Sequence, residues 1–301
     1  MSNSIKKFEI SLAIAGGGCK ALYGLGVGFM LRKWGLRIKE LSGVSAGSAI
    51  AMMILSKREE EGIEYFEELL RRNDSNFRPF QLLKGKRPWP HENMYKRTLQ
   101  YSIDFNKIIH TKVKIFIHSV KAFPRKKKLI NYWNKLRLIP RTMRAVILDE
   151  KDLISGKAPT RVKKIIEEWN FQDVLFTNKD FKSENFIEHL IMISSSIPPV
   201  VRFQKMDEEY YFDGGLTNNL LLEPFSPNRK KIGVYYEKAT ILTKSKESLK
   251  NTYLINPESV LPITTFDYTN SDGARAAYEL GKIDAEKHKD RLYDFLGSKY
   301  E

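Results

Sequence analysis

The chain has 301 residues, of which 42% are hydrophobic and 12% aromatic, and this composition excludes a globally disordered protein. It contains no run of 18 apolar residues, so we expect no membrane-spanning helix. The net charge of +15 predicts a polyanionic partner, either a membrane surface rich in anionic lipid or a nucleic acid.

Short apolar strands alternate with helices along most of the chain. Strands are predicted at residues 10–15, 36–44, 112–120, 173–177, 210–212, 232–236 and 251–255. Helices are predicted at residues 21–34, 45–56, 63–72, 129–139, 159–169, 184–195 and 271–296. This alternation indicates an α/β protein with a mostly parallel central sheet that helices cover on both faces.

The regular alternation fails between residues 73 and 148, where four proline-containing stretches interrupt it. We therefore interpret 73–148 as a basic insertion or cap on a single catalytic domain that spans residues 1–301. Between Asp104 and Asp149 there are twelve basic residues and no acidic residue. Such a patch suits an anionic membrane surface. The predicted membrane contacts are Arg125, Lys126, Lys127, Lys128 and Trp133.

The alternative for this basic segment is a solvated face that merely aids solubility. Nucleic acid is not favoured as the partner, because no nucleic-acid-binding motif accompanies the charge. We therefore expect a protein that associates peripherally with membranes.

The stretch Gly43-Val44-Ser45-Ala46-Gly47 reads G-x-S-x-G and lies where a predicted strand turns into a helix. Such an elbow holds a serine hydroxyl on a tight, strained bend, where it can act as a nucleophile. Gly43 and Gly47 are needed because a Cβ atom would clash where strand and helix come close. The alternative is an ordinary tight turn in which Ser45 caps the helix.

A second candidate, Asp213, follows an aromatic strand and enters the turn Gly214-Gly215. A carboxylate that acts as a general base needs a raised pKa, and burial against apolar neighbours such as Phe212 and Leu216 provides one. The alternative is a turn aspartate that accepts hydrogen bonds from its own backbone.

Histidine is scarce, and only His288 follows Asp213, in a strongly charged helix that reads as a solvated face. We therefore expect Asp213 to serve Ser45 directly as the base of a Ser-Asp dyad. Cys19, the one cysteine, excludes an internal disulfide and fits a reducing compartment, which indicates a cytoplasmic protein. The sequence has no cluster with metal-ligand spacing, so we expect no metal and no cofactor.

A glycine loop precedes both candidates, and its consecutive residues Gly16, Gly17 and Gly18 can turn their N–H groups toward one point. Such donors would stabilise the oxyanion of a tetrahedral intermediate. Lys20 would add a positive charge or hold the loop. The alternative is a dinucleotide site, because the loop also fits G-x-G-x-x-G/A with Glu40 as the ribose ligand.

With these three motifs in this order, the sequence resembles the patatin-like phospholipases. That family's pattern is a loop G-G-G-x-[KR]-G, then G-x-S-x-G, then D-G-[GA], which correspond here to residues 16–21, 43–47 and 213–215. The resemblance covers about residues 10–219 but does not extend over 73–148. The sixth loop position is alanine, Ala21, which is harmless if that position is already helical.

The resemblance implies a three-layer α/β/α fold and a lipid acyl hydrolase that is independent of calcium. It implies Ser45 as nucleophile, Asp213 as base and Gly16 to Gly18 as the oxyanion loop. We therefore expect an enzyme of the phospholipase A or lysophospholipase type that cleaves carboxylic esters of membrane glycerophospholipids through an acyl-enzyme. The alternatives are an acyltransferase or acyl-thioester hydrolase, or a membrane-binding module with an inactive core. A protein partner or activator stays open.

Overall fold

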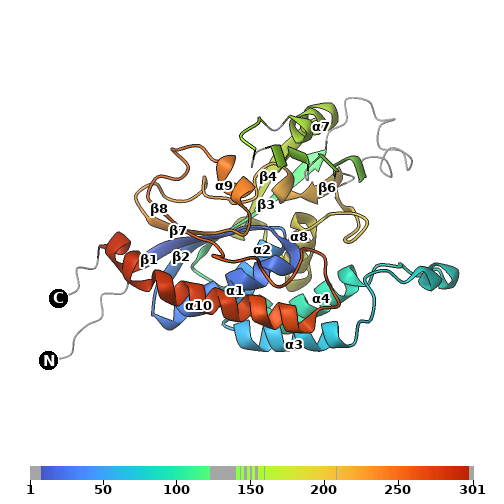
Figure 1. Ribbon diagram of the computed structural model, residues 1–301, viewed down its shortest axis with the longest axis horizontal. Helices are drawn as coiled ribbons and strands as arrows, with labels where there is room; N and C mark the ends of the chain where they lie inside the picture. The colour runs from blue at the N-terminus through green and yellow to red at the C-terminus, as the bar shows by residue number, and fades with distance from the viewer. Residues whose placement is uncertain are drawn as a thin grey trace.

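The centre of the molecule is a mixed β-sheet (Figure 1). The computed structural model describes residues 8–122, 140–142, 144–145, 148–149, 151–152, 155–158, 160–207 and 209–297. The strands within these ranges are β1 (Glu9–Ile14), β2 (Arg37–Val44), β3 (Lys114–Ala122), β4 (Phe171–Thr177), β5 (Gln204–Met206), β6 (Glu209–Asp213), β7 (Lys230–Val234) and β8 (Thr252–Ile255).

The strands lie in the order β5-β6-β3-β2-β1-β7-β8, and β4 also pairs with β3. All neighbours from β3 across to β8 run parallel, whereas β4, β5 and β6 join by antiparallel pairing. The prediction of a mostly parallel sheet is therefore confirmed, with antiparallel pairing at one side.

Helices cover both faces of the sheet. In the described ranges they are α1 (Leu22–Lys33), α2 (Ala46–Ser56), α3 (Glu59–Arg71), α4 (His91–Ser102), α5 (Phe105–Ile109), α7 (Arg161–Trp169), α8 (Glu184–Ser194), α9 (Lys238–Leu242) and α10 (Ser271–Leu296). Short 3-10 turns are η1 (Gly18–Ala21), η2 (Pro79–Lys84), η4 (Asn178–Asp180) and η5 (Gly214–Leu216). Among all of these, no helix has the length and apolar character to cross a bilayer.

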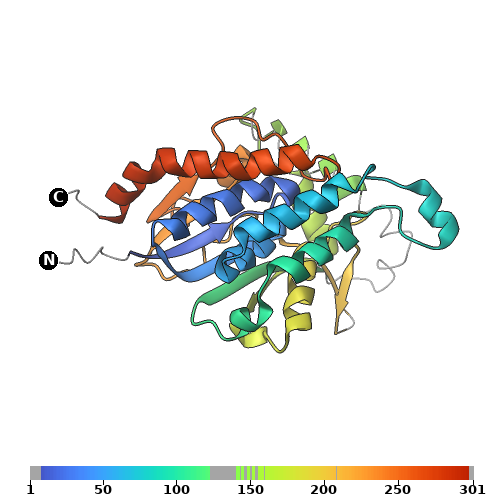
Figure 2. The same ribbon diagram turned by 90° about the horizontal axis from the view of Figure 1, so that it is seen from below.

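The two helical layers differ in extent. Helices α1, α3, α4 and α10 lie side by side on one face, whereas α7 and α9 lie over the other (Figures 1 and 2). Side chains of β1 alternate between the two faces, because successive residues of a strand point in opposite directions. Ile10, Leu12 and Ile14 join the large core, while Ala13 and Ala15 join a smaller core on the opposite face. The structure thus has the expected three-layer α/β/α arrangement.

The prediction that residues 73–148 form an insertion over the core is wrong for β3, which lies inside the sheet and has both β2 and β4 as neighbours. Its alternating residues Ile115 and Ile117 are fully buried. The segment was interpreted as part of a surface insertion because it is rich in lysines. A strand can, however, be buried at its centre and carry lysines at its ends, as β3 does. The predicted helix at 129–139 lies outside the described residues.

Strand β3 also brings together two segments that are far apart in the chain. Val44, the last residue of β2, pairs with His118 of β3, and Asp213, the last residue of β6, pairs with the next residue, Ser119. Strand β4 occupies the opposite edge over the same residues. Strands β2 and β6 therefore lie end to end along one edge of β3, and because they run toward each other, their carboxyl ends meet.

Candidate active site

Ser45 lies in the sharp turn between β2 and α2, with φ 53° and ψ −133°. L-amino acids rarely adopt this conformation, and such backbone strain is concentrated at functional sites. The turn depends on its glycines. A Cβ atom on Gly43 would lie 2.4 Å from Cα of Ser48, and one on Gly47 would lie 2.4 Å from the carbonyl oxygen of Ala15. The elbow predicted from the sequence is therefore present.

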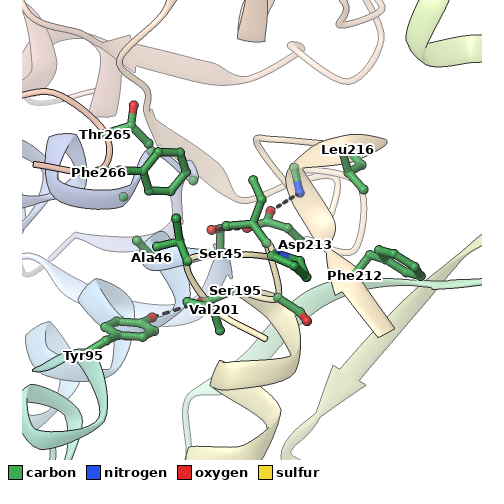
Figure 3. A pocket seen from close by; sticks show the side chains of 18 of the residues that line it. Ser45, Ala46, Tyr95, Ser195, Val201, Phe212, Asp213, Leu216, Thr265 and Phe266 are labelled. Atoms are coloured by element: carbon green, nitrogen blue, oxygen red, sulfur yellow. Dashed lines mark hydrogen bonds between the residues drawn. The ribbon is translucent and has the colours of Figure 1, made fainter. Parts of the chain in front are cut away.

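The carboxylate of Asp213 faces the Ser45 hydroxyl, as Figure 3 shows. Oγ of Ser45 donates a hydrogen bond to Oδ2 of Asp213, across 168 positions in the sequence. The other carboxylate oxygen, Oδ1, accepts the N–H of Gly215 at 2.7 Å. The structure thus brings the two predicted residues together, at the point where β2 and β6 meet.

Asp213 is buried, and burial raises the pKa of its carboxyl group to about 6. Three contacts oppose this shift: the hydrogen bond from Ser45, the hydrogen bond from the Gly215 N–H, and the charge of His118. A pKa near the working pH suits a general base, because the group is ionised and still takes up a proton readily.

The backbone around the elbow is held by two residues outside the three sequence motifs, Ser194 and Asn219. The N–H of Ser45 donates to Oγ of Ser194 at 2.9 Å, and that hydroxyl donates to the carbonyl of His118 at 2.6 Å. Asn219 donates from its side chain to the carbonyl of Gly16 at 3.2 Å. Ser194 begins a run of three serines and Asn219 lies four residues after the Gly214-Gly215 turn, and this was the available signal for them.

The glycine loop lies beside the dyad. The N–H of Gly16 donates to the carbonyl of Asn219 at 3.3 Å. Those of Gly17 and Gly18 have no acceptor within the described part of the chain. Two of the three predicted oxyanion donors are therefore free to bind a ligand. Ala46, the first residue of α2 and the residue directly after the serine, has a third N–H without an acceptor in the described part of the chain. In the elbow motif, the N–H at this position is an oxyanion donor.

Lys20 forms an ion pair with Glu237 at 2.5 Å, with both side chains partly exposed. It thus ties the loop to the segment that follows β7, in line with the expectation that it holds the loop. The turn after Asp213 is equally tight. A Cβ atom on Gly214 would lie 2.5 Å from the carbonyl of His118, and one on Gly215 would lie 2.8 Å from the side chain of Asn219.

If Gly18 is an oxyanion donor, as the sequence predicts, we expect Gly18→Ala to displace it and to lower kcat/KM for ester hydrolysis by about 100-fold or more. Gly18 has φ +55°, and an added Cβ would lie 2.1 Å from the carbonyl oxygen of Thr265. The matched control is Gly35→Ala, since Gly35 has φ +79° and nothing within 4 Å of the added Cβ. Kinetics with a soluble ester would test this, and equal activity of the two variants would contradict the role given to the loop.

The alternative of a dinucleotide site does not fit the structure. Glu40, the proposed ribose ligand, is buried and accepts hydrogen bonds from the hydroxyls of Ser11 and Ser226, each at 2.6 Å. Its carboxylate is therefore already engaged inside the protein. Among the described residues there is also no group of three or more histidine, cysteine or acidic side chains that could hold a metal ion.

A pocket of about 800 Å³ opens over the dyad, within the range of small-molecule sites. One part of its lining is strongly apolar, and Phe171 and Phe203 each pack with their ring centroids 5.0 Å from that of Phe212. Other lining residues, such as Asn76 and Asp267, are polar. No histidine lines the pocket in the described part of the chain, and the titratable side chain bonded to Ser45 is Asp213.

The predicted membrane contacts at residues 125–128 and at Trp133 lie outside the described residues. The prediction that His288 lies on a solvated face is wrong in part, because the side chain is half-buried and makes a 2.8 Å hydrogen bond with the hydroxyl of Tyr253. His288 does not line the pocket. Cys19 is buried, which raises the pKa of its thiol and leaves it chemically inert.

Comparison with known proteins agrees with the three motifs. The sequence matches the family model described as patatin-like phospholipase over residues 12–226. In structure the chain is similar to VipD from Legionella pneumophila, with a TM-score of 0.43 and 14% sequence identity, over 94% of this chain and 67% of VipD. No curated protein matches the sequence significantly. Because the family match covers more than half of its length, the chain belongs to the patatin-like phospholipase family of lipid acyl hydrolases.

Proposed function

We propose that the protein is a phospholipase of the A or lysophospholipase type, with Ser45 as nucleophile and Asp213 as general base. The hydrogen bond between Oγ of Ser45 and Oδ2 of Asp213 carries this proposal. A serine hydroxyl is a weak nucleophile until a base within hydrogen-bond reach takes its proton. The buried carboxylate, with its pKa of about 6, is that base.

The reaction proceeds in two steps. Asp213 takes the hydroxyl proton as Oγ of Ser45 attacks the ester carbonyl carbon, and the oxyanion is bound by the free N–H groups of Gly17 and Gly18. The protonated Asp213 then gives its proton to the departing alkoxide, which leaves an acyl group on Ser45. In the second step Asp213 activates a water molecule that hydrolyses this acyl-enzyme, and the enzyme is restored.

The pocket fits an ester with a long apolar chain. Its apolar part, around Phe203 and Phe212, would bind the acyl chain, while the polar part near Asn76 and Asp267 would face the glycerol and headgroup. In Figure 3, Phe212 and Leu216 lie on one side of the dyad and Tyr95 on the other. A substrate ester bond placed at Ser45 therefore has aromatic side chains available on both sides.

Because such substrates reside in membranes, we propose that the protein works as a peripheral enzyme at an anionic lipid surface in the cytoplasm. Its net charge of +15 supports this attraction.

Product analysis tests the proposed function. Incubated with vesicles of phosphatidylcholine and anionic phosphatidylglycerol, the protein should release free fatty acid and lysophospholipid, identified by mass spectrometry. A fluorophosphonate probe should label Ser45, identified by peptide mapping. Transfer of the acyl group to an added alcohol in preference to water would instead indicate an acyltransferase. The absence of both products and label would indicate an inactive core.

A further inference from the structure

A long excursion of the chain, residues 74–90 between α3 and α4, projects away from the rest of the protein; we call it the arm. Figures 1 and 2 both show it as the teal segment that extends beyond the end of α4, with η2 near its tip. It belongs to neither the sheet nor the two layers of helices.

The arm carries exposed apolar side chains that no core requires. Phe80 is 77% exposed, Leu82 59% and Leu83 86%, and all three belong to η2. Phe77 is 47% exposed and packs against Trp89, with ring centroids 5.2 Å apart. Single exposed apolar residues are common on protein surfaces, but several of them together on a projecting tip mark an interaction site.

Beyond Asp74 at its base, which pairs with Arg78, the charged residues of the arm are all basic. Residues 75–91 contain no acidic residue, and Lys84 and Lys86 beside the tip are exposed and form no ion pair within the described part of the chain. Amphipathic elements with apolar residues next to lysines bind the boundary between headgroups and acyl chains, and each lysine near anionic lipid adds about 1 kcal/mol. This chemistry matches a lipid surface.

The base of the arm is fixed to the rim of the pocket. Oδ1 of Asn76 accepts the N–H of Tyr268 at 2.8 Å, and the side chain of Asn73 donates to the carbonyl of Tyr268 at 2.6 Å. At the end of the arm that leads into α4, Arg87 donates a hydrogen bond to the carbonyl of Pro199 at 2.6 Å. Asn76 and Tyr268 line the pocket over the dyad. The orientation of the arm is therefore coupled to that of the pocket opening.

We propose that the tip of the arm, residues 79–84, inserts into the interfacial region of an anionic bilayer and holds the pocket opening against the lipid. Phe80, Leu82 and Leu83 enter the acyl boundary, while Lys84 and Lys86 contact the anionic headgroups. This goes beyond the proposed chemistry, because binding through the arm requires neither Ser45 nor Asp213.

A fluorescent probe at the tip tests insertion directly. Leu83→Cys, made in a Ser45→Ala background so that lipid stays intact, offers one reactive thiol because Cys19 is buried. An environment-sensitive label there should shift its emission to the blue with phosphatidylcholine vesicles that contain about 30 mol% phosphatidylglycerol. The same label at the exposed position of Ile283 on α10 should not shift. Equal behaviour of the two labels would overturn the proposal.

A pair of matched variants tests the energetic role. We expect Phe80→Ser/Leu83→Ser to weaken vesicle binding by about 100-fold, since loss of each buried apolar side chain weakens binding by roughly tenfold. The control Leu242→Ser/Ile283→Ser, which removes two other exposed apolar side chains, should bind like the parent. Hydrolysis of a soluble short-chain ester by Phe80→Ser/Leu83→Ser should equal that of the wild type, whether that rate is high or zero.

Two results would contradict the membrane role of the arm. One is unchanged vesicle flotation by Phe80→Ser/Leu83→Ser. The other is concentration-dependent self-association of the wild type without lipid, which this variant abolishes, because it would show that the tip binds a second copy of the chain. Hydrolysis of the soluble ester by Ser45→Ala tests the proposed dyad, whereas vesicle binding by Phe80→Ser/Leu83→Ser tests the arm. The two proposals can therefore fail independently of each other.

Discussion

Asp213→Asn is expected to lower kcat/KM for ester hydrolysis by about 1,000-fold or more, and yet to stabilise the folded protein at neutral pH. The activity falls because an amide cannot take the proton from Ser45. The stability rises because the native carboxylate is buried and its pKa is raised from 3.8 to about 6. A difference of that size corresponds to roughly 3 kcal/mol in the free energy of unfolding. Asparagine has almost the same shape and keeps an oxygen for the N–H of Gly215.

The sign follows from proton uptake. Because the native carboxyl group has the higher pKa, the native state holds its proton between about pH 4 and 6, whereas the unfolded chain has released it. The stability of the wild type therefore decreases as the pH rises through this window. Urea unfolding of both proteins at pH 7 and at pH 4 measures the effect, and the advantage of the asparagine variant should disappear at the lower pH.

The same pKa predicts the pH profile of the wild-type enzyme. Only ionised Asp213 can act as the base, so kcat/KM should fall below about pH 6. An Asp213→Asn variant that is as active as the wild type, or a profile that stays flat down to pH 4, would contradict the role given to this residue.

Ser45→Ala and Ser45→Gly are both expected to lower kcat/KM by about 1,000-fold or more, because each removes the nucleophile. They should differ in stability. The backbone at residue 45 has φ 53°, which strains alanine but suits glycine. We expect the glycine variant to be more stable than the alanine variant by about 1–3 kcal/mol.

Comparison of the two variants removes the effect of the lost hydroxyl, since both lack it. Their urea midpoints at constant pH report the strain of the elbow, and fluorophosphonate labelling reports the nucleophile. Retained labelling of Ser45→Ala on another residue, with wild-type turnover, would disprove the assignment of the nucleophile. Equal stability of the two would show that the turn relaxes once the serine is replaced.

Much of the fold could be predicted from local patterns. The helix predicted at 271–296 has the bounds of α10, and the turn at Ser45 is recognisable because its glycines obey a steric rule that spacing reveals. The strand predicted at 112–120 is present as β3, but it was assigned to the insertion because its lysines and the prolines around it resemble a surface segment. Its burial depends on β2 and β4, which lie far away in the chain.

The site itself was predictable only in part. Ser45 and Asp213 stand in short motifs, but the position of one against the other depends on the register of β3, which no short pattern encodes. The hydroxyl of Ser194 forms hydrogen bonds with two backbone groups. Nothing in the sequence distinguishes this serine from other serines, because its partners come from distant segments of the chain. The apolar tip of the arm was missed because its residues have no periodicity.

The end-to-end arrangement of β2 and β6 on β3 has a consequence for biosynthesis. Strand β2 and the elbow leave the ribosome long before Asp213, and the acid meets the serine only after β6 docks beside Ser119. A partly folded or truncated chain would therefore display the hydroxyl without its proton acceptor. Under the proposed mechanism, such a chain lacks the base that activates Ser45, so ester hydrolysis would require β6 to have docked on β3.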